Sequence, residues 1–526
     1  MKSHKNFPCR GVLTTMLACL LVSAAMAQNA PVPPASPSAD GPIQDLQEQV
    51  RELRSLVEEM RAENAQSRTE MQKLREDLQA TRALLERPAD SNLNQVASQP
   101  ASTPHSTAQQ SSVAQSSLED RVQKLEDSTS LINSKVDEQY QTKVETASKY
   151  RARLHGIVLM NAFRNVGGSN NFDLPDYAES LPSFFPQATF GATLRQSEIG
   201  LEVFGPTLMG AKTSADVQMD FAGGFTAGGN GVNFGLARLQ TASLRFDWAH
   251  TSVVAGQDAL FISPLSPTSF ASLAEPAFGL AGNLWGWTPQ LRIEHRFDMP
   301  GQQNVTIQAG IIDNLDWEYP YNSFYRNPNA GELSGQPAYA VRTAWSHPVH
   351  DRPLSLGVAG YYGRQNWTWS RYVDAWAAMA DWQVPLTPRL ALSGEFYRGR
   401  GVGGLGGGIA TSILYGGDPA NPFSPIRGLD SEGGWAQLKL QVTPKIELNG
   451  AFGQDNPFAS DVRGFATDQN NFGPILGRNR GALANVIFRP RSDLILAAEL
   501  RRLRTFPVYS GSSMTSQLNL SIGILF

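Results

Sequence analysis

The chain has 526 residues, of which 44 are lysine or arginine and 48 are aspartate or glutamate, so its formal net charge is −4 at pH 7. Without a basic surplus, it offers no general electrostatic case for binding nucleic acid. Its two cysteines, Cys9 and Cys19, both lie within the first 27 residues, so the chain beyond them has no thiol for a disulfide or for metal binding.

Residues 1–27 have the pattern of a secretory signal peptide. Three basic residues precede an apolar run from Gly11 to Ala25, and Ala25-Met26-Ala27 fits cleavage before Gln28. A run of about 15 residues is shorter than the roughly 20 that a membrane-spanning helix needs. A lipoprotein anchored through Cys19 is the less favoured alternative, because Met16-Leu17-Ala18 is a poor lipobox. The pattern therefore predicts export from the cytoplasm.

Next come a Pro-rich tether at 28–42 and a predicted coiled coil at 43–87. The coiled-coil prediction rests on unbroken 3-4 spacing over six heptads, with polar residues elsewhere. The spaced positions are Ile43, Leu46, Val50, Leu53, Val57, Met60, Asn64, Ser67, Met71, Leu74, Leu78, Thr81 and Leu85.

A Ser/Gln/Pro-rich stretch at 88–116 is predicted to be a disordered linker, and the same spacing resumes more weakly in a second helical segment at 117–149. These helices need partner chains to bury their apolar seams. Ile or Val at a, Leu at d and Asn64 at an a position favour a dimer. A trimer is nevertheless expected, on the resemblance given below.

Residues 150–526 have a different composition, with 45 of the 47 glycines and all ten tryptophans. Their repeating unit is a strand with apolar residues at alternate positions. We predict sixteen strands, at 152–165, 190–205, 210–222, 236–248, 251–258, 289–298, 303–313, 338–348, 353–364, 371–384, 389–400, 432–443, 445–454, 479–490, 492–506 and 513–526.

The connections between these strands are alternately short and, for the most part, long and rich in Gly, Pro and Asn. Short turns on one rim and long loops on the other are typical of a transmembrane barrel with both termini on the short-turn side. An even strand number allows antiparallel closure. The sequence therefore predicts an all-β transmembrane barrel of about 16 antiparallel strands, preceded by an α-helical coiled-coil region.

Aromatic residues end the strands that descend to the short-turn rim, as in a membrane-interface girdle. All but Phe204 are in phase with the apolar face of their strand. The final strand alternates apolar and polar residues from Leu518 and ends at Phe526. This ending resembles the signal that the barrel-assembly machinery reads in outer-membrane proteins. The aromatic positions are Phe204, Trp248, Phe297, Trp345, Trp382, Phe488 and Phe526.

The opposite phase of the strands carries many charges, which would cost about 2–4 kcal/mol each in hydrocarbon. Sixteen strands leave room for an aqueous channel, so this face is predicted to line a wet interior. Arg195 and Ser197 break the pattern, because they share a phase with apolar Ile199 and Leu201. A subunit interface or a bulge would accommodate them.

The third long loop, Asp258 to Thr288, contains two charges, Asp258 and Glu275, and many aromatic residues. It is expected to fold inward, with arginines of neighbouring strands across the opening. Cations that face acids create a transverse field that favours anions where arginine dominates. The alternative is that these arginines simply pair with Glu294 and Asp247. The predicted pore-lining and constriction residues are Arg245, Asp258, Glu275, Gln290, Arg292, Glu294, Arg296 and Arg342.

The coiled-coil N-terminus, Gly256-Gln257-Asp258, the long loop and Pro289-Gln290-Leu291-Arg292 together resemble the dicarboxylate-channel family of Gram-negative porins. Phosphate-selective porins with coiled coils are the nearest other match, but acids mixed among the arginines count against phosphate. The resemblance implies a homotrimer in outer-membrane lipid that passes small anionic solutes, with a periplasmic coiled coil, no cofactor and a constricting third loop as in general trimeric porins.

Three other functions were weighed. A hydrolase is disfavoured because the histidines beyond the signal peptide lie mostly at turns, in the linker or on the lipid face, so no catalytic residue and no metal site is predicted. A carbohydrate-selective channel would use loop aromatics for stacking, namely Trp285, Trp287, Tyr319, Tyr321, Tyr325, Trp367 and Trp369. A structural protein, tethered toward the cell wall by its coiled coil, is the third possibility.

Overall fold

The computed structural model describes residues 151–225, 235–314, 326–350, 352–471 and 473–526. The predicted signal peptide, tether, first coiled coil, linker and second helical segment, together 1–149, lie outside the described residues and stay predictions. So do the loop aromatics Tyr319, Tyr321 and Tyr325. Among the residues that are described, no helix is both long enough and apolar enough to cross a membrane.

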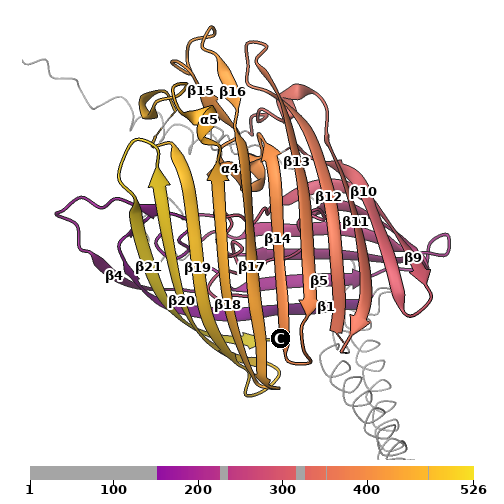
Figure 1. Cartoon of the computed structure of the whole chain (residues 1–526). Coiled ribbons are helices and arrows are strands. Elements are labelled where there is room, and N and C mark those ends of the chain that lie inside the picture. Colours follow the sequence, from indigo (N-terminus) through magenta and orange to yellow (C-terminus); the bar gives the residue numbers. More distant parts are fainter. Residues whose placement is uncertain (1–150, 226–234, 315–325, 351, 472) are drawn as a thin grey trace, which may run out of the picture. The chain divides into compact units, whose positions relative to one another are not determined.

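Within the described ranges, sixteen antiparallel strands close into a barrel (Figure 1). β4 and β5 are two pieces of one barrel strand, and every predicted strand is confirmed. The strands are β1 (Arg151–Val166), β4 (Ala188–Thr193) with β5 (Glu198–Phe204), β6 (Lys212–Asp220), β7 (Arg238–Asp247), β8 (Thr251–Ala259), β9 (Trp287–Met299), β10 (Gln303–Ile312), β11 (Ala338–Val349), β12 (Arg352–Asn366), β13 (Tyr372–Pro385), β14 (Leu390–Arg400), β17 (Asp430–Thr443), β18 (Ile446–Pro457), β19 (Leu476–Phe488), β20 (Leu494–Pro507) and β21 (Ser513–Leu525).

Short connections follow β5, β7, β9, β11, β13, β17 and β19, and gather on the rim where the chain ends (Figure 1). Most connections on the other rim are longer and carry small elements of their own. These are β2 (Gly168–Ser169), β3 (Ala178–Glu179), η1 (Glu332–Ser334), η2 (Gly403–Leu405), α4 (Gly407–Ala410), β15 (Ile413–Tyr415), β16 (Ile426–Gly428), α5 (Ala459–Val462) and η3 (Asp468–Asn470).

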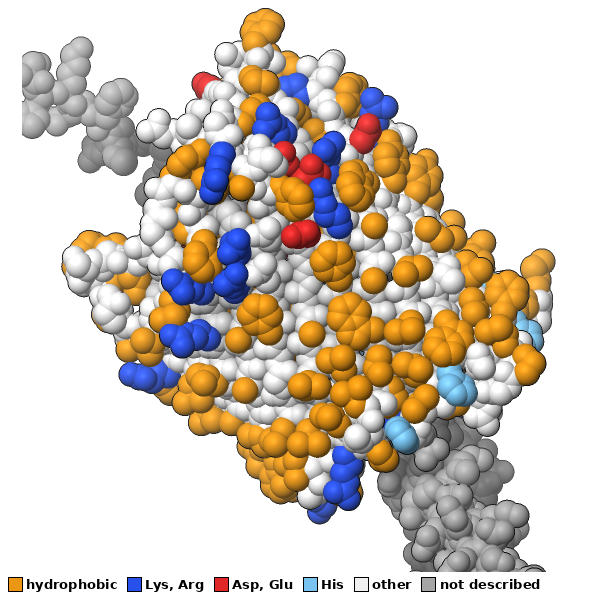
Figure 2. Space-filling model, viewed as in Figure 1, with side chains coloured by type: hydrophobic (Ala, Val, Ile, Leu, Met, Phe, Trp, Pro, Cys, Tyr) orange, Lys and Arg blue, Asp and Glu red, His pale blue; other side chains and the backbone are white. Residues whose placement is uncertain are grey.

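The last strand shows how the wall separates two environments. In β21, Leu518 and Leu520 point outward and are about half exposed, whereas Gln517 and Asn519 point inward and are buried. Exposed apolar side chains at every second position of neighbouring strands suit a lipid phase and would be unfavourable in water. Figure 2 shows the apolar band that results on the outer face.

The aromatic residues at the short-turn rim point outward as predicted, and Phe204 is the predicted exception. Trp248, Phe297, Phe488 and Phe526 are exposed on the outer side of the short-turn rim. Phe204 points inward instead, where the guanidinium carbons of Arg151 and Arg153 lie 5.5 Å and 5.9 Å from its ring centroid.

The interruption between β4 and β5 explains why Arg195 and Ser197 broke the alternation. A turn at this point directs three consecutive polar side chains inward. Arg195 Nη1 forms an ion pair with Asp173 at 2.9 Å, and Ser197 Oγ accepts a hydrogen bond from the Leu159 amide at 3.0 Å. Gln196 contacts the third loop. The break thus belongs to the interior and is the bulge-like alternative that the sequence left open.

The barrel closes between its first and last strands, β1 and β21. The Gly156 amide donates to the Phe526 carbonyl at 3.0 Å, and the Phe526 amide returns a bond to Gly156 at 3.1 Å. A Cβ on Gly156 would lie 2.3 Å from the Glu198 carbonyl oxygen and 2.8 Å from the Phe526 ring. Backbone and aromatic ring therefore approach Gly156 too closely for any side chain.

We expect Gly156→Ala to destabilise the closed barrel by about 1–3 kcal/mol, since the added methyl group overpacks the seam. Urea unfolding in lipid vesicles and heat-modifiable mobility on gels measure this loss. Gly450→Ala is the matched control, because Gly450 is also an outward strand glycine but has nothing within 4 Å of its ideal Cβ. Equal stability of the two variants would contradict the proposed role of the Gly156–Phe526 contact.

Candidate functional site

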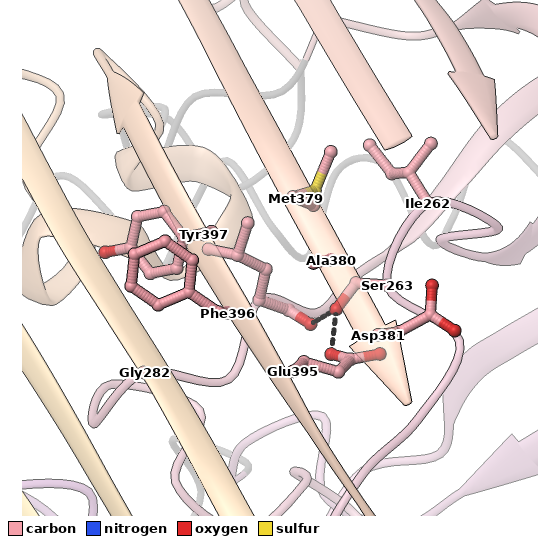
Figure 3. Close-up of a pocket in the computed structure, with 10 residues that line it drawn as sticks. Ile262, Ser263, Gly282, Met379, Ala380, Asp381, Glu395, Phe396 and Tyr397 are labelled. Atoms are coloured by element: carbon pink, nitrogen blue, oxygen red, sulfur yellow. Dashed lines mark hydrogen bonds between the residues drawn. The ribbon is translucent and has the colours of Figure 1, made fainter. Parts of the chain in front are cut away.

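Residues 260–286, here called the third loop, connect β8 to β9 and lie against the inner wall of the barrel. Glu395 of β14 holds the start of the loop, because its carboxylate accepts hydrogen bonds from Ser263 Oγ at 2.5 Å and from the Leu265 amide at 2.8 Å. Figure 3 shows Ser263 and Glu395 pointing toward one another, with Asp381 of β13 beside them.

Further inward-facing side chains hold the rest of the third loop. Gln437 of β17 accepts from the Thr268 amide at 2.6 Å, and Glu499 of β20 accepts from Ser269 Oγ at 2.5 Å. Gln196, at the break between β4 and β5, accepts from the Leu273 amide at 2.8 Å. The loop therefore leaves β8, passes along strands that are distant in sequence and returns to β9.

An apolar contact fastens the middle of the third loop to β18 and β19. Phe278 is buried over Gly453 and Gly481, and a Cβ on Gly481 would lie 2.5 Å from the Phe278 ring. Ala281, Trp435, Ala451 and Leu483 complete this cluster. Glycines at inward positions of strands mark places where another segment approaches closely. Inward strand glycines such as Gly453 and Gly481 could therefore have indicated loop docking from the sequence, but the sequence-based prediction did not include them.

The interior is consequently less wet than predicted. Besides the cluster around Phe278, the inward residues Ile157, Leu159, Ile487 and Ile495 form a buried apolar cluster against Phe270 of the third loop. Where the loop covers the wall, these apolar residues are buried beside the polar residues that anchor the loop, Glu395, Gln437 and Glu499. The expectation that the whole opposite phase faces water was therefore wrong, because the loop supplies apolar partners.

A second segment, residues 401–412, also folds inward and packs on the third loop. The Trp285 amide donates to the Leu405 carbonyl at 3.0 Å, and a Cβ on Gly406 would lie 2.6 Å from the Gly279 carbonyl oxygen. Tyr397 supports this segment, since its hydroxyl accepts from the Gly408 amide at 2.9 Å. Together the two loops occupy part of the lumen.

Predicted residues form a ladder of ion pairs across β7, β8 and β9, partly covered by Phe261 of the third loop, whose ring centroid lies 5.7 Å from the Arg292 guanidinium carbon. Arg245 contacts Glu294 at 3.1 Å, and Arg292 contacts Glu294 and Asp258 at 2.8 Å each. Arg292 also donates to Gln290 Oε1 at 2.9 Å. Each of these arginines therefore has a carboxylate partner on its own wall.

Gln308 of β10 extends the ladder to β11 and β13. Its amide donates to Glu294 at 3.0 Å and accepts from Arg342 at 3.0 Å, while Arg342 pairs with Asp381 at 2.7 Å. Gln308 was not predicted, although its place on the inward phase of β10 pointed to it. The charge ladder thus joins six of the eight predicted residues, namely Arg245, Asp258, Gln290, Arg292, Glu294 and Arg342.

The other two predicted residues lie elsewhere. Arg296 pairs with Asp298 at 2.9 Å near the short-turn rim, where both side chains are about half exposed. Glu275 lies in the third loop, with Arg238 of β7 at 3.9 Å and the Asp176 carboxyl group also facing it. Neither residue is part of the charge ladder.

Cations and carboxylates of the inner wall differ in exposure. Arg245 is 38% exposed and its partner Glu294 15%, while Lys439 and Arg489 are each 34% exposed around Glu447, which is 8% exposed. The pair of Arg292 and Asp258 is reversed, at 9% and 24%. Asp247, the second partner of Arg245, is 35% exposed. Around Glu294 and Glu447, an entering solute therefore meets the cation more readily than the acid.

We expect Glu395→Ala to loosen the third loop, because Ser263 and Leu265 lose their shared acceptor at a cost of about 1–3 kcal/mol. Hydrogen exchange of the Leu265 amide should accelerate, and channel recordings should become noisier. Ser393→Ala, on the same inward face of β14, is the control and should behave as wild type. An unchanged Leu265 exchange rate in Glu395→Ala would mean that this carboxylate does not hold the loop.

The contact between Glu275 and Asp176 should depend on pH. Burial, reinforced by the Asp176 carboxylate, raises the pKa of Glu275 from 4.5 to about 8, against the opposing effect of Arg238 and Arg195. Since this pKa is raised on folding, the contact is fully stable below pH 4.5 and is lost as the pH rises through 8. Hydrogen exchange of the amides of residues 271–275, corrected for the intrinsic rate, should rise from pH 5 to 9. Glu275→Gln should abolish that rise, and a rise that persists would point to another group.

Comparisons with known proteins agree on the architecture. No family model and no curated relative matches the chain. The outer membrane channel DcaP of Acinetobacter baumannii is similar in structure, with a TM-score of 0.54 and 14% identity over 73% of this chain and 100% of that one. The anion-selective porin of Comamonas acidovorans (0.43; 13%; 72% and 100%) and OprB of Pseudomonas putida (0.43; 14%; 72% and 94%) are more distant. The resemblance to outer-membrane porins is thereby confirmed for the fold, a closed barrel of sixteen antiparallel strands.

Proposed function

We propose that this protein is an outer-membrane porin through which small hydrophilic solutes, preferentially anions, diffuse passively. The observation that carries this proposal is the two-sided wall: apolar side chains outside, and inside a charge ladder whose most open member, Arg245, is a cation. Charges at this density on an inner face require a hydrated lumen. A channel needs no catalytic group and no cofactor, and we assign none.

The third loop is the proposed constriction. It is held at both ends by β8 and β9, and its first part is attached to Glu395, Gln437 and Glu499 on the far strands. A segment attached at this many points narrows the lumen at a defined place. Within the ladder, the loop covers Arg292, which is 9% exposed and lies 5.7 Å from the Phe261 ring centroid, and leaves Arg245 open at 38%. Solutes would pass between Arg245 and the loop.

The proposed anion preference rests on exposure and not on net charge. Lys439 and Arg489 are more exposed than Glu447, which pairs with both of them, and Arg245 is more exposed than Glu294 and about as exposed as Asp247. A cation that is closer to the solute than its counter-ion produces a local field that favours anions.

Strand length favours a homotrimer. β6, β7 and β8 have nine or ten residues each, the lower end of the length that crosses a bilayer, whereas β12, β13, β20 and β21 have 13 to 15. A lipid-facing strand needs about 9–11 residues. We propose that the short-stranded side contacts neighbouring protomers, while the long-stranded side contacts lipid. The coiled coil predicted at 43–87 would lie in the periplasm of a Gram-negative cell, and the barrel-assembly machinery would recognise Phe526.

A carbohydrate-selective channel has less support. Trp285 is buried, and its indole nitrogen donates to the Gly279 carbonyl at 3.2 Å, so its ring belongs to the packing of the two inward loops. Trp367 is likewise buried, against Val373 and Ile413. These two rings are therefore not available to stack on a sugar. A tether toward the cell wall concerns residues outside the described ranges and is compatible with a porin.

Reversal potentials in planar bilayers with asymmetric KCl test this function. The wild type should form pores that pass chloride better than potassium. Lys439→Gln/Arg489→Gln should lower the chloride preference about fivefold, since one charge at 4 Å in water contributes about 1 kcal/mol.

The matched control is Lys445→Gln/Arg491→Gln, which removes two cations from short turns that lie outside the lumen. It should keep the wild-type ratio. Absence of any pore would refute the channel. Pores with the same ratio in all three proteins would refute the assignment of anion preference to Lys439 and Arg489.

A further inference from the structure

The outer face of β19 and β20 carries an arginine patch, defined as Arg478, Arg480, Arg502 and Arg504. These residues alternate with inward-facing ones, so all four point away from the lumen. Arg480 and Arg504 are direct cross-strand partners. Figure 2 shows basic side chains gathered over these strands, on the side of the barrel toward the long loops. Like charges that face each other across a sheet destabilise it unless an anion lies between them.

No carboxylate neutralises the arginine patch within the residues that the structure describes. The hydrogen-bond acceptors of Arg478, Arg480 and Arg504 are neutral: Asn456 Oδ1 at 3.0 Å, Gln454 Oε1 at 2.6 Å and Ser512 Oγ at 3.2 Å. Arg502 contacts the sulfur of Met514 at 2.9 Å. By contrast, Arg400 on the same outer face pairs with Asp430 at 2.9 Å.

An aromatic ring gathers the guanidinium groups of the patch. The guanidinium carbons of Arg504, Arg480 and Arg478 lie 4.9 Å, 5.7 Å and 5.9 Å from the centroid of Phe506. Such contacts hold arginine side chains in place without neutralising them. Beside the ring is a groove of about 350 Å³, lined by Phe506, Arg478 and a further cation, Arg463. Three guanidinium groups of the patch are therefore held around one ring, and one of them, Arg478, borders with Arg463 a groove that is open to a ligand.

The height of the patch indicates which environment it meets. Going up β20 from the short-turn rim, the outward residues are Leu494, Leu496, Ala498 and Leu500, followed by Arg502 and Arg504. Eight residues separate Leu494 from Arg502, about 26 Å along the strand and about 19 Å in height at a tilt of 45°. The apolar band of such barrels is about 25 Å tall. Arg504, two residues further along, is at about 23 Å by the same measure, so the patch lies at the upper edge of this band, on the long-loop side.

We infer that the arginine patch and its groove bind the phosphate groups of the phosphorylated glycolipid in the outer leaflet. Arginine forks bind phosphate oxygens in pairs, and the acyl chains would lie on the apolar residues below them. This inference rests on the proposed porin function only for the orientation that puts long loops at the cell surface.

A neighbouring protomer is a poorer occupant. The exposed outward residues on the short-stranded side are apolar, as Leu201, Val217 and Leu244 show. That face therefore offers no carboxylates to complement the arginines. Phosphate groups supply the missing negative charge, and the lipid brings them to the required height.

Binding of lipid A to the detergent-purified full chain tests the inference, with thermal stabilisation and native mass spectrometry as readouts. Wild type should bind bis-phosphorylated lipid A at least about tenfold more tightly than the dephosphorylated form. Arg480→Gln/Arg504→Gln should lose most of this difference. Arg398→Gln/Arg400→Gln, on the same outer face but beside Asp430, should keep it.

Equal affinity of the wild type for both forms of lipid A would overturn the inference, whatever the variants do. So would lipid binding that is unchanged in Arg480→Gln/Arg504→Gln, or loss of the oligomer in that variant without loss of lipid, which would indicate a protein contact. The wild-type comparison stands even if the variant does not fold. Conductance of the same samples tests the channel separately, because a pore can exist without the lipid site and the lipid site can exist without a pore.

Discussion

The hydrogen bonds that join the first strand to the last are the constraint on which the rest of this structure depends. Hydrocarbon offers no partner to a free backbone N–H or C=O group, so a sheet in a bilayer must have no open edge. Here β1 meets β21 along ten residue pairs, and Gly156 and Phe526 complete the seam with reciprocal bonds. Once the sheet is closed, every strand has one face toward lipid and one toward the interior. This is why apolar residues recur at every second position of the strands.

Closure creates an interior that the inward side chains divide into two parts. One set, with Glu395, Gln437 and Glu499, provides acceptors for the third loop and is covered by it. The other set, the charge ladder around Arg245 and Glu294, forms ion pairs among its own side chains and is open to the lumen at Arg245. The same kinds of residue thus serve as loop anchors on one wall and as pore lining on the other, and the path of one loop decides which.

On the outer face, in contrast to the inner wall, a group of arginines has no carboxylate partner among the described residues. Arginines of the ladder are each paired, because an unpaired cation beside a narrow lumen would be costly and would trap anions. Arginines of the outer patch are unpaired, held by Phe506 and by neutral side chains. This difference is explained if the outer cations have an external counter-ion, and the phosphate groups of the outer-leaflet lipid would supply it.

The sequence by itself determined the strands, their number, the alternation of short and long connections and the lipid-facing phase, since each depends on residues at most a few positions apart. It named Glu294 and Asp247 as alternative partners of the arginines, and these pairs form. It could not determine the break at Arg195 or the apolar part of the interior. Gln196 meets a loop 77 residues later. Local periodicity contains no record of such distant partners. Only the closed tertiary structure decides which inward residue faces another side chain, a folded loop or water.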